Sequence, residues 1–220
     1  MDKAKIASMI DHAVLKPEAT DSDVERECEI SMKYKVASIC VKSCHVEFAA
    51  KLLQDSTVKV STVIGFPHGT TTTRCKVAEA QEAIDNGASE LDMVINIGKL
   101  LSREFDYVEK DIKSVVDQAH SKGAIVKVIL ETALLDDELK VAACKICDKC
   151  GADYVKTSTG FNGRGARLDD IAIMKNSVSD RVGIKASGGI KTFEQAMAFA
   201  KAGCTRLGTS STIDIVDEKA

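Results

Sequence analysis

The segment CGADYVKTST, residues 150–159, carries the pattern on which the fold prediction depends. A helical stretch ends at glycine and a small residue, and a short strand-like run begins directly afterwards. Glycine suits the left-handed position just beyond a helix C-terminus. The same pattern recurs, with Gly87, Gly123 and Gly203 in the place of Gly151, in NGASELDMVIN (Asn86–Asn96), KGAIVKVILE (Lys122–Glu131) and AGCTRLGTSS (Ala202–Ser211).

Extending this pattern along the chain predicts eight strands separated by seven helices. The strands are expected at Met9–Leu15, Ala37–Val41, Lys59–Phe66, Glu90–Asn96, Ile125–Glu131, Tyr154–Thr159, Gly183–Ser187 and Arg206–Ser210. The helices are expected at Asp21–Lys35, His45–Gln54, Thr73–Asn86, Glu104–Ser121, Asp136–Lys149, Leu168–Asn176 and Phe193–Lys201. A capping box formed by Ser22 and Glu25 is predicted near the start of the first of these helices.

Eight strand–helix alternations predict an α/β protein, a single-domain (β/α)8 TIM barrel over residues 1–220 with a short extra N-terminal helix. An open doubly wound sheet is the alternative. Such a sheet more often has a glycine-rich dinucleotide turn after its first strand, and DHAVLKP is not one.

Composition narrows the classes of partner. The chain has 220 residues, 29% charged and 45% hydrophobic, with a net charge of −3, so nucleic acid and membrane partners are not expected. The N-terminal stretch has no signal-peptide core, and no apolar run approaches the length of a membrane span. Eight cysteines without an export signal indicate reduced thiols and a cytoplasmic location.

Three lysines recur at equal intervals in successive strands: Lys127, Lys156 and Lys185. In a barrel the outer strand face is covered by helices and must be apolar, so these lysines and Asp92 are expected to point inward. For a single lysine the structural explanation is an internal salt bridge, which we favour for Lys127, with Glu131 or Asp92 as its partner.

Chemistry explains the group Lys156, Lys185 and Asp92 better than structure does, because three buried charges are costly in one core. Two neighbouring ammonium groups lower each other's pKa, and a neutral lysine can attack a carbonyl to form a Schiff base. A nearby aspartate can transfer protons. This chemistry requires neither a metal nor a cofactor.

Two glycine-rich segments follow the last two strands, ASGGI (Ala186–Ile190) and LGTSST (Leu207–Thr212). Backbone N–H groups and hydroxyls in such loops bind anions, and the loops after strands 7 and 8 form a recurrent phosphate site in these barrels. The sequence therefore predicts a phosphorylated carbonyl substrate.

The whole pattern resembles the deoxyribose-phosphate aldolases. The motifs are IDHAVLKP (Ile10–Pro17), ASICV (Ala37–Val41), VIGFPHG (Val63–Gly69), ELDMVIN (Glu90–Asn96), KVILET (Lys127–Thr132), VKTSTGF (Val155–Phe161) and IKASGGI (Ile184–Ile190). The resemblance implies a metal-free class I aldolase, a carbon–carbon lyase. Its reaction would be the reversible cleavage of 2-deoxy-D-ribose 5-phosphate to D-glyceraldehyde 3-phosphate and acetaldehyde, in deoxyribonucleotide and carbohydrate catabolism.

The resemblance also implies roles for individual residues. Lys156 would form the Schiff base, Lys185 would perturb it and transfer protons, and Asp92 would be the proton-relay acid. Substrate and phosphate would be bound by Thr159, Gly160, Gly188, Gly189, Gly208, Ser210, Ser211, Asp11 and Cys40.

Two features depart from the family pattern. Some members have a lysine where Phe161 stands, so backbone amides, with Arg164 or Arg167, are expected to bind the phosphate here. Some members also have a C-terminal tyrosine, whereas the tail STIDIVDEKA has none. A water held by Asp92 and Lys185 is our hypothesis for the final proton donor.

The remaining motifs have simple explanations. Cys144, Cys147 and Cys150 have a metal-like spacing, but on a helix they are interpreted as packed thiols rather than metal ligands. Cys40 is expected near the substrate, where an aldehyde adduct could inactivate the enzyme. For His68, a capping or loop role is favoured over lining the barrel mouth.

Two other functions remain open from the sequence. One is another class I phosphosugar aldolase or a transaldolase-like barrel, which would differ in its carbonyl donor. The other is a non-catalytic phosphosugar-binding barrel, which would bind its ligand without forming an imine. The expected partners are phosphosugar and aldehyde substrates. A homodimer is the assembly considered.

Overall fold

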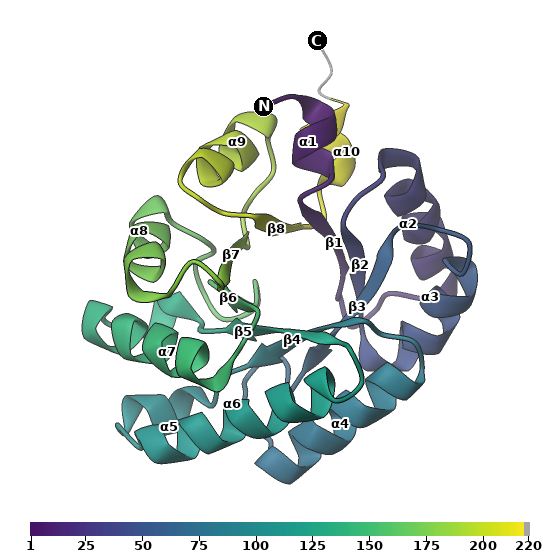
Figure 1. Cartoon of the computed structure of the whole chain (residues 1–220). Coiled ribbons are helices and arrows are strands. Elements are labelled where there is room, and N and C mark those ends of the chain that lie inside the picture. The colour runs from purple at the N-terminus through teal and green to yellow at the C-terminus, as the bar shows by residue number, and fades with distance from the viewer. Residues whose placement is uncertain (218–220) are drawn as a thin grey trace.

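The computed structural model describes residues 1–217, and residues 218–220, the end of the quoted tail segment, lie outside the described residues. Eight parallel strands form a closed barrel in which each strand pairs with the next and β8 pairs with β1 (Figure 1). The (β/α)8 prediction is confirmed. The strands are β1 (Ile10–Val14), β2 (Ser38–Val41), β3 (Lys59–Ile64), β4 (Glu90–Val94), β5 (Ile125–Ile129), β6 (Tyr154–Lys156), β7 (Gly183–Ser187) and β8 (Arg206–Thr209).

Helices surround the barrel on the outside (Figure 1). The seven predicted helices and the short N-terminal helix are all present. They are α1 (Lys3–Ala7), α2 (Asp21–Tyr34), α3 (Val46–Leu52), α4 (Thr73–Asp85), α6 (Phe105–His120), α7 (Asp137–Cys150), α8 (Leu168–Ser177) and α9 (Phe193–Lys201). The sequence did not predict α5 (Ile97–Leu101), α10 (Thr212–Val216) or the 3-10 turns η1 (Ser43–His45) and η2 (Thr132–Leu134), which are too short to show a clear helical period.

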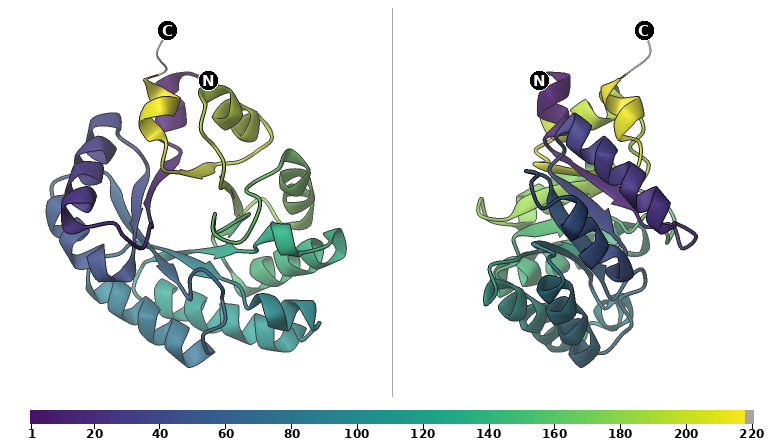
Figure 2. Two further views of the ribbon diagram at one scale, coloured as in Figure 1. Left: turned by 180° about the vertical axis from the view of Figure 1, so that it is seen from behind. Right: turned by 90° about the vertical axis from the view of Figure 1, so that its right-hand side faces the viewer.

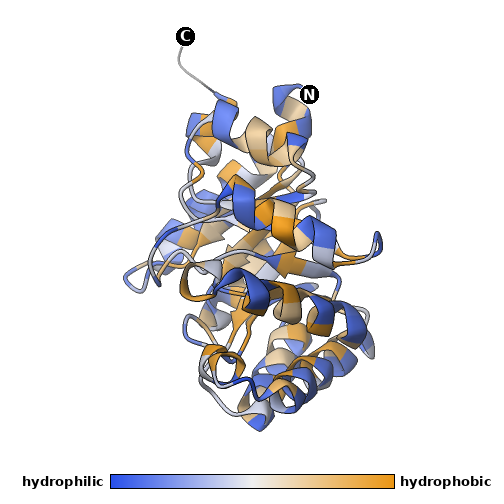
Figure 3. Ribbon diagram, turned by 90° about the vertical axis from the view of Figure 1, so that its left-hand side faces the viewer, coloured by the Kyte–Doolittle hydropathy of each residue, from blue (hydrophilic) through white to orange (hydrophobic). Residues whose placement is uncertain are grey.

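The apolar core lies between the barrel and the helices. Leu91 and Met93 on β4, with Val126 and Val128 on β5, are fully buried. They alternate along the strands with Asp92 and Lys127, so they lie on the outer face, which was predicted to be apolar. Figure 3 shows hydrophobic colour on helix faces that turn toward the strands and hydrophilic colour on the outer faces. The barrel interior is thus left to the alternate, polar residues.

Strand register places the predicted inward residues side by side. Asp92 on β4 pairs with Lys127 on β5, and Lys156 on β6 pairs with Lys185 on β7. Asp11 on β1 pairs with Gly208 on β8, which closes the barrel. Residues distant in the sequence therefore meet inside one ring of strands.

The strands end earlier than the sequence predicted. The expected strand Tyr154–Thr159 ends at Lys156, and beyond it the Thr157 hydroxyl accepts a hydrogen bond from Ser187 N–H at 3.1 Å. The expected strand Ile125–Glu131 ends at Ile129, because Glu131 has a left-handed backbone with φ of 57°. Both differences lie at the carboxyl ends of the strands.

The predicted capping box was wrong by two residues. Thr20, not Ser22, is the N-cap of α2, and its hydroxyl accepts from the N–H of Asp23. The Asp23 carboxylate accepts in return from Thr20 N–H at 2.9 Å. Ser22 and Glu25 lie inside the helix, since its first residue is Asp21.

The two ends of the described chain lie side by side. Helix α1 packs against α10, and the two views of Figure 2 agree on this arrangement. Among residues 1–217, no helix has the length and apolar character needed to cross a membrane.

Candidate active site

A cavity of about 610 Å³ opens at the carboxyl ends of the strands. Its wall is formed by the ends of β1, β6, β7 and β8 and by the loops that follow them. Eleven of the twelve predicted site residues line it: Asp11, Cys40, Lys156, Thr159, Gly160, Lys185, Gly188, Gly189, Gly208, Ser210 and Ser211. Parallel strands bring these residues together because they all end at the same edge of the barrel.

Lys156 lies at the floor of the cavity with 4% of its surface exposed. Its Nζ donates to Asp92 Oδ2 at 2.7 Å. Burial lowers the pKa of Lys156 below its usual value of 10.5, and nearby Lys185 adds to this effect, although Asp92 opposes it. An amine held in this way can lose its proton and act as a nucleophile.

Lys185 has a stronger hold on its proton. Its Nζ donates to the same Asp92 Oδ2 at 2.6 Å and also to Asp11 Oδ2. Burial lowers the pKa of Lys185, but Asp11 and Asp92 outweigh burial, so the pKa is raised. Of the two, Lys156 is therefore the lysine whose pKa is lowered and Lys185 the one whose pKa is raised, whereas the sequence analysis expected each to lower the pKa of the other.

Asp92 connects the two lysines beneath the cavity floor. It is completely buried and, unlike the other predicted site residues, does not line the cavity. Burial acts to raise its pKa, but Lys127, Lys156 and Lys185 outweigh it and hold the pKa well below the usual 3.8. Asp92 is thus a carboxylate that reaches the cavity only through the lysine side chains.

Lys127 forms the internal salt bridges that the sequence analysis favoured. Its Nζ lies 2.8 Å from Asp92 Oδ1, 2.6 Å from Glu90 Oε2 and 3.3 Å from Asp11 Oδ2. Glu131, the other partner considered, is not among these contacts. Lys127 does not line the cavity, which leaves it without access to a bound molecule.

Glycine loops form one side of the cavity. Gly188 and Gly189 both have positive φ angles, 86° and 79°, which turn the chain between β7 and α9. At Gly208 a Cβ would lie 3.1 Å from Lys185 Cε, so glycine leaves room for that lysine. Ser210 and Ser211 follow after Thr209, and Ser211 donates its N–H to Thr209 Oγ1 at 2.9 Å.

The comparisons with known proteins match this geometry. The family model for the DeoC/LacD family aldolases covers residues 5–215. The chain belongs to this aldolase family. A curated deoxyribose-phosphate aldolase from Clostridium perfringens is 52% identical over 100% of this chain and 97% of its own length.

Solved structures agree with this assignment. A chain from Coccidioides immitis, itself assigned as a deoxyribose-phosphate aldolase, is 42% identical with a TM-score of 0.95, covering 99% of this chain and 87% of that one. The deoxyribose phosphate aldolase from Aeropyrum pernix, described as tetrameric, is 33% identical with a TM-score of 0.92. The alignment with it covers 98% of this chain and 91% of that chain.

In this family member, neither predicted arginine reaches the cavity. Arg164 pairs with Asp170 Oδ2 at 2.5 Å, and Arg167 lies 3.4 Å from Asp169 Oδ2. Neither arginine lines the cavity, so the geometry gives no support to the expectation that they help to bind phosphate. The cavity is instead lined by Lys191, which directly follows the ASGGI segment and could have been noted from that position.

The sequence analysis also missed the role of Glu131. Its buried carboxylate accepts from the Thr159 hydroxyl, from Thr159 N–H at 3.2 Å and from Asn162 Nδ2 at 3.1 Å. Asn162 Nδ2 also donates to Pro67 O at 2.8 Å. Glu131 therefore fixes the loop after β6, and the Thr159 hydroxyl is engaged by Glu131 while the residue lines the cavity.

The aromatic residue in the lysine position is part of the cavity mouth. Phe161 lines the cavity, is 47% exposed, and contacts Phe66 edge-on with ring centroids 5.3 Å apart. His68 is exposed and does not line the cavity, which agrees with the loop role favoured from the sequence.

The cysteines divide into two groups. Cys144, Cys147 and Cys150 are buried in α7, as the packing interpretation requires, and burial raises the pKa of each thiol. Among the described residues, no three His, Cys, Asp or Glu side chains are grouped to hold a metal. Burial, together with Asp92, also raises the pKa of Cys40, which disfavours the thiolate that attacks aldehydes.

Proposed function

We propose that the chain cleaves 2-deoxy-D-ribose 5-phosphate, reversibly, to D-glyceraldehyde 3-phosphate and acetaldehyde through a Schiff base on Lys156. One observation carries the proposal: Lys156 borders the cavity and has a single carboxylate oxygen, Asp92 Oδ2, which it shares with Lys185. The curated relatives at about half identity, which are deoxyribose-phosphate aldolases, support the substrate.

The neutral amine of Lys156 would attack the aldehyde carbon C1 of the open-chain sugar. The carbonyl oxygen leaves as water after it takes up two protons, and a protonated imine remains. One of these protons comes from the attacking nitrogen itself, and Lys185, an ammonium that lines the cavity, would donate the other. Asp92 would take part through the protons that it exchanges with the two lysines, because it does not line the cavity.

The imine then accepts electrons. When the C3 hydroxyl gives its proton to Lys185, which is neutral after its earlier donation, the C2–C3 bond breaks. Its electron pair moves toward the imine nitrogen, and glyceraldehyde 3-phosphate is released. The resulting enamine takes a proton at C2, and water hydrolyses the imine to release acetaldehyde. We assign the C2 proton to a water beside Lys185, which refines the hypothesis of a water held by both Asp92 and Lys185.

The phosphate would bind at the glycine loops. Gly188, Gly189, Gly208, Ser210 and Ser211 line the side of the cavity where backbone N–H groups and hydroxyls approach one another. Lys191, on the same loop as Gly189, adds a positive charge there. Asp11 and Cys40 line the cavity with Lys156 and would shape the sugar-binding region around it.

Borohydride trapping with acetaldehyde, followed by peptide mass spectrometry, tests the mechanism. We expect an ethyl group on Lys156 alone. An adduct on Lys185 would keep the chemistry but reverse the assignment of the neutral amine. A folded protein with no adduct would contradict the Schiff base and favour a non-catalytic binding barrel. Trapping with hydroxyketones in place of acetaldehyde tests the transaldolase-like alternative.

We also propose that residues 1–220 form one domain, which assembles as a homodimer in the cytoplasm. The family model spans residues 5–215, and the eight cysteines are all unpaired, as in a reducing compartment. Light scattering on the purified protein tests the assembly. A tetramer, as described for the relative from Aeropyrum pernix, would replace the dimer.

A further inference from the structure

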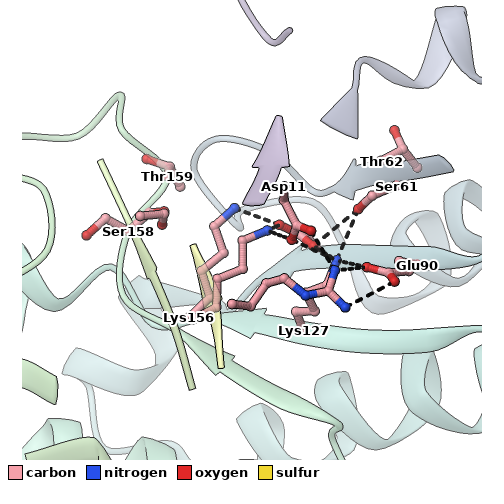
Figure 4. A network of polar contacts seen from close by, with 12 residues as sticks. Asp11, Ser61, Thr62, Glu90, Lys127, Lys156, Ser158 and Thr159 are labelled. Atoms are coloured by element: carbon pink, nitrogen blue, oxygen red, sulfur yellow. Dashed lines mark hydrogen bonds and ion pairs between the residues drawn. The ribbon is translucent and has the colours of Figure 1, made fainter. Parts of the chain in front are cut away.

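Seven charged side chains form a continuous column inside the barrel (Figure 4). Arg206 Nη1 lies 2.5 Å from Asp11 Oδ1 and 2.7 Å from Glu90 Oε2. Asp11 also receives a hydrogen bond from Lys185, which leads to Asp92 and Lys156. The members are Arg206, Glu90, Lys127, Asp11, Lys185, Asp92 and Lys156.

The column has one more basic group than acidic groups. A net charge in a buried interior is costly, and the cost is relieved when one basic group gives up its proton. Arg206 cannot do so, because a guanidinium stays protonated in proteins. The surplus proton must therefore leave one of the three lysines.

The contacts decide which lysine loses the proton. Lys127 lies within salt-bridge distance of three carboxylates, and Lys185 contacts two. Lys156 contacts one, Asp92, and it borders the cavity, where water can carry the proton away. Lys156 is thus the least stabilised ammonium and the most accessible one.

Glu90 and Arg206 lie at the opposite end of the barrel from the cavity. They are the first residues of β4 and β8, and neither lines the cavity. The Arg206 guanidinium stacks over the Tyr154 ring, 5.4 Å from its centroid, and its side chain is only 12% exposed. At Gly183 a Cβ would lie 2.3 Å from the Tyr154 ring, so glycine leaves room for the ring that stacks on Arg206.

We propose that Glu90 and Arg206 are positioning residues for the reaction. From the end of the barrel opposite the cavity, they set the net charge of the column so that Lys156 is the amine that loses its proton. This inference rests on the proposed function of Lys156. Lys156 contacts Asp92 on β4, and the other titratable groups that act on it are Lys185 on β7 and Cys40 on β2, which line the same cavity. Lys127 on β5 and Asp11 on β1 link these groups to the far end.

The two members of the far pair should act in opposite directions. Arg206→Met removes the surplus positive charge, so Lys156 should keep its proton to higher pH. Glu90→Gln removes a carboxylate that contacts Lys127, so Asp92 must neutralise more of the charge of Lys127. Asp92 then stabilises the Lys156 ammonium less, and Lys156 should lose its proton at lower pH. The double variant again has one more basic group than acidic groups in the column and should behave like the unchanged protein.

The experiment is the pH profile of kcat/KM for cleavage, with the rate of imine trapping on Lys156 as a second readout. We expect the midpoint of the acid limb to rise by about one pH unit in Arg206→Met and to fall by about one unit in Glu90→Gln. In the double variant it should return to the original midpoint. Arg206→Lys, which keeps the charge, should leave the midpoint in place.

A purely structural role predicts a different pattern. Both single variants would lose activity at every pH without moving the midpoint, and the double variant would be worse than either, which would overturn the inference. The exposed pair Arg103–Glu138, with N···O of 2.7 Å, supplies matched controls in Arg103→Met and Glu138→Gln, which should not move the midpoint.

Arg206→Met and Glu90→Gln are each expected to move the midpoint in a stated direction. If one variant does not fold, the other still tests the inference. Failure of the proposed function is distinguishable, because the unchanged protein would then give no ethyl adduct on Lys156. An adduct on Lys156 together with unmoved midpoints in the folded variants would overturn only the inference about Glu90 and Arg206.

Discussion

Two buried lysine–aspartate pairs of almost equal length have different surroundings. Lys156 lies 2.7 Å from Asp92 inside the barrel, and Lys76 lies 2.6 Å from Asp111 between α4 and α6. We refer to them as the barrel pair and the helix pair. Burial lowers the pKa of both lysines, and the neighbouring aspartate opposes this effect in both. A lowered lysine pKa therefore does not by itself identify a reactive amine.

The two pairs differ in whether the carboxylate is shared with a second lysine and in whether the lysine borders the cavity. In the helix pair, Lys76 also donates to Val94 O at 2.9 Å, and Asp111 accepts from Thr73 Oγ1 at 2.8 Å, so both partners are satisfied. In the barrel pair, the same carboxylate oxygen is shared with Lys185, and Lys156 borders the cavity. Within residues 1–217, the hydrogen bonds and ion pairs of the helix pair include no second ammonium, and neither partner lines the cavity.

The sharpest test replaces each lysine by methionine. Lys156→Met should lower kcat/KM for cleavage by at least about 10³-fold, because the attacking amine is gone. Lys76→Met should retain kcat/KM in the folded fraction, since Lys76 does not reach the cavity. Steady-state assays with folding checked by circular dichroism measure both. Equal losses in the two folded variants would remove the functional distinction between the pairs.

The second test concerns stability. Asp111→Ala should lower the free energy of unfolding by about 3–5 kcal/mol, because Lys76 would then be a buried charge without its carboxylate. Urea unfolding measures the change. Replacing both partners, as in Lys76→Met with Asp111→Leu, should cost much less. If the double replacement were as damaging as Asp111→Ala, packing rather than charge would explain the loss.

The third test uses pH. The pKa of Asp92 is held well below 3.8 in the folded chain, so the unfolded chain takes up a proton first as the pH falls. The stability from Asp92 is present above about pH 3.8 and is lost below it, by about 1.4 kcal/mol per pH unit. Asp92→Asn should make the acid dependence of unfolding shallower. Asp214→Asn, at an exposed position in α10, should leave that dependence unchanged.

The smallest expected effect belongs to the surroundings of the helix pair. Thr73→Val removes the hydroxyl that donates to Asp111 Oδ1 and should cost about 1 kcal/mol in unfolding free energy. The value of kcat/KM should stay the same. A change in kcat/KM without a change in unfolding free energy would show that α4 influences the active site, contrary to the comparison.

The sequence predicted the regular part of the fold well because period and glycine position are local properties. Gly87, Gly123, Gly151 and Gly203 all have positive φ, as the repeated unit required. The strand ends were less predictable. At Glu131 the left-handed backbone is accompanied by hydrogen bonds to Thr159 and Asn162, residues far along the chain.

The site was predicted through alternation along each strand. Inward placement of Asp92, Lys156 and Lys185 follows from the two-residue period once the barrel is assumed. Arg164 pairs with Asp170 in the first turn of α8, a contact between a loop and a helix that no local pattern in the sequence indicated. Lys76 gave no signal, since a lysine in a helix is ordinarily exposed and only the packing of α4 on α6 buries it.

The amino-acid sequence by itself determined the barrel, the order of its strands and the inward placement of Asp92 and the three lysines, because these follow from local periodicity and chain order. Only the tertiary structure decided that the pKa is lowered at Lys156 and raised at Lys185. That choice depends on how three carboxylates are divided among four basic groups, and Asp11, Glu90, Asp92 and Arg206 come from three different strands. Contacts between strands that are distant in sequence set the electrostatic balance, which no local pattern contains.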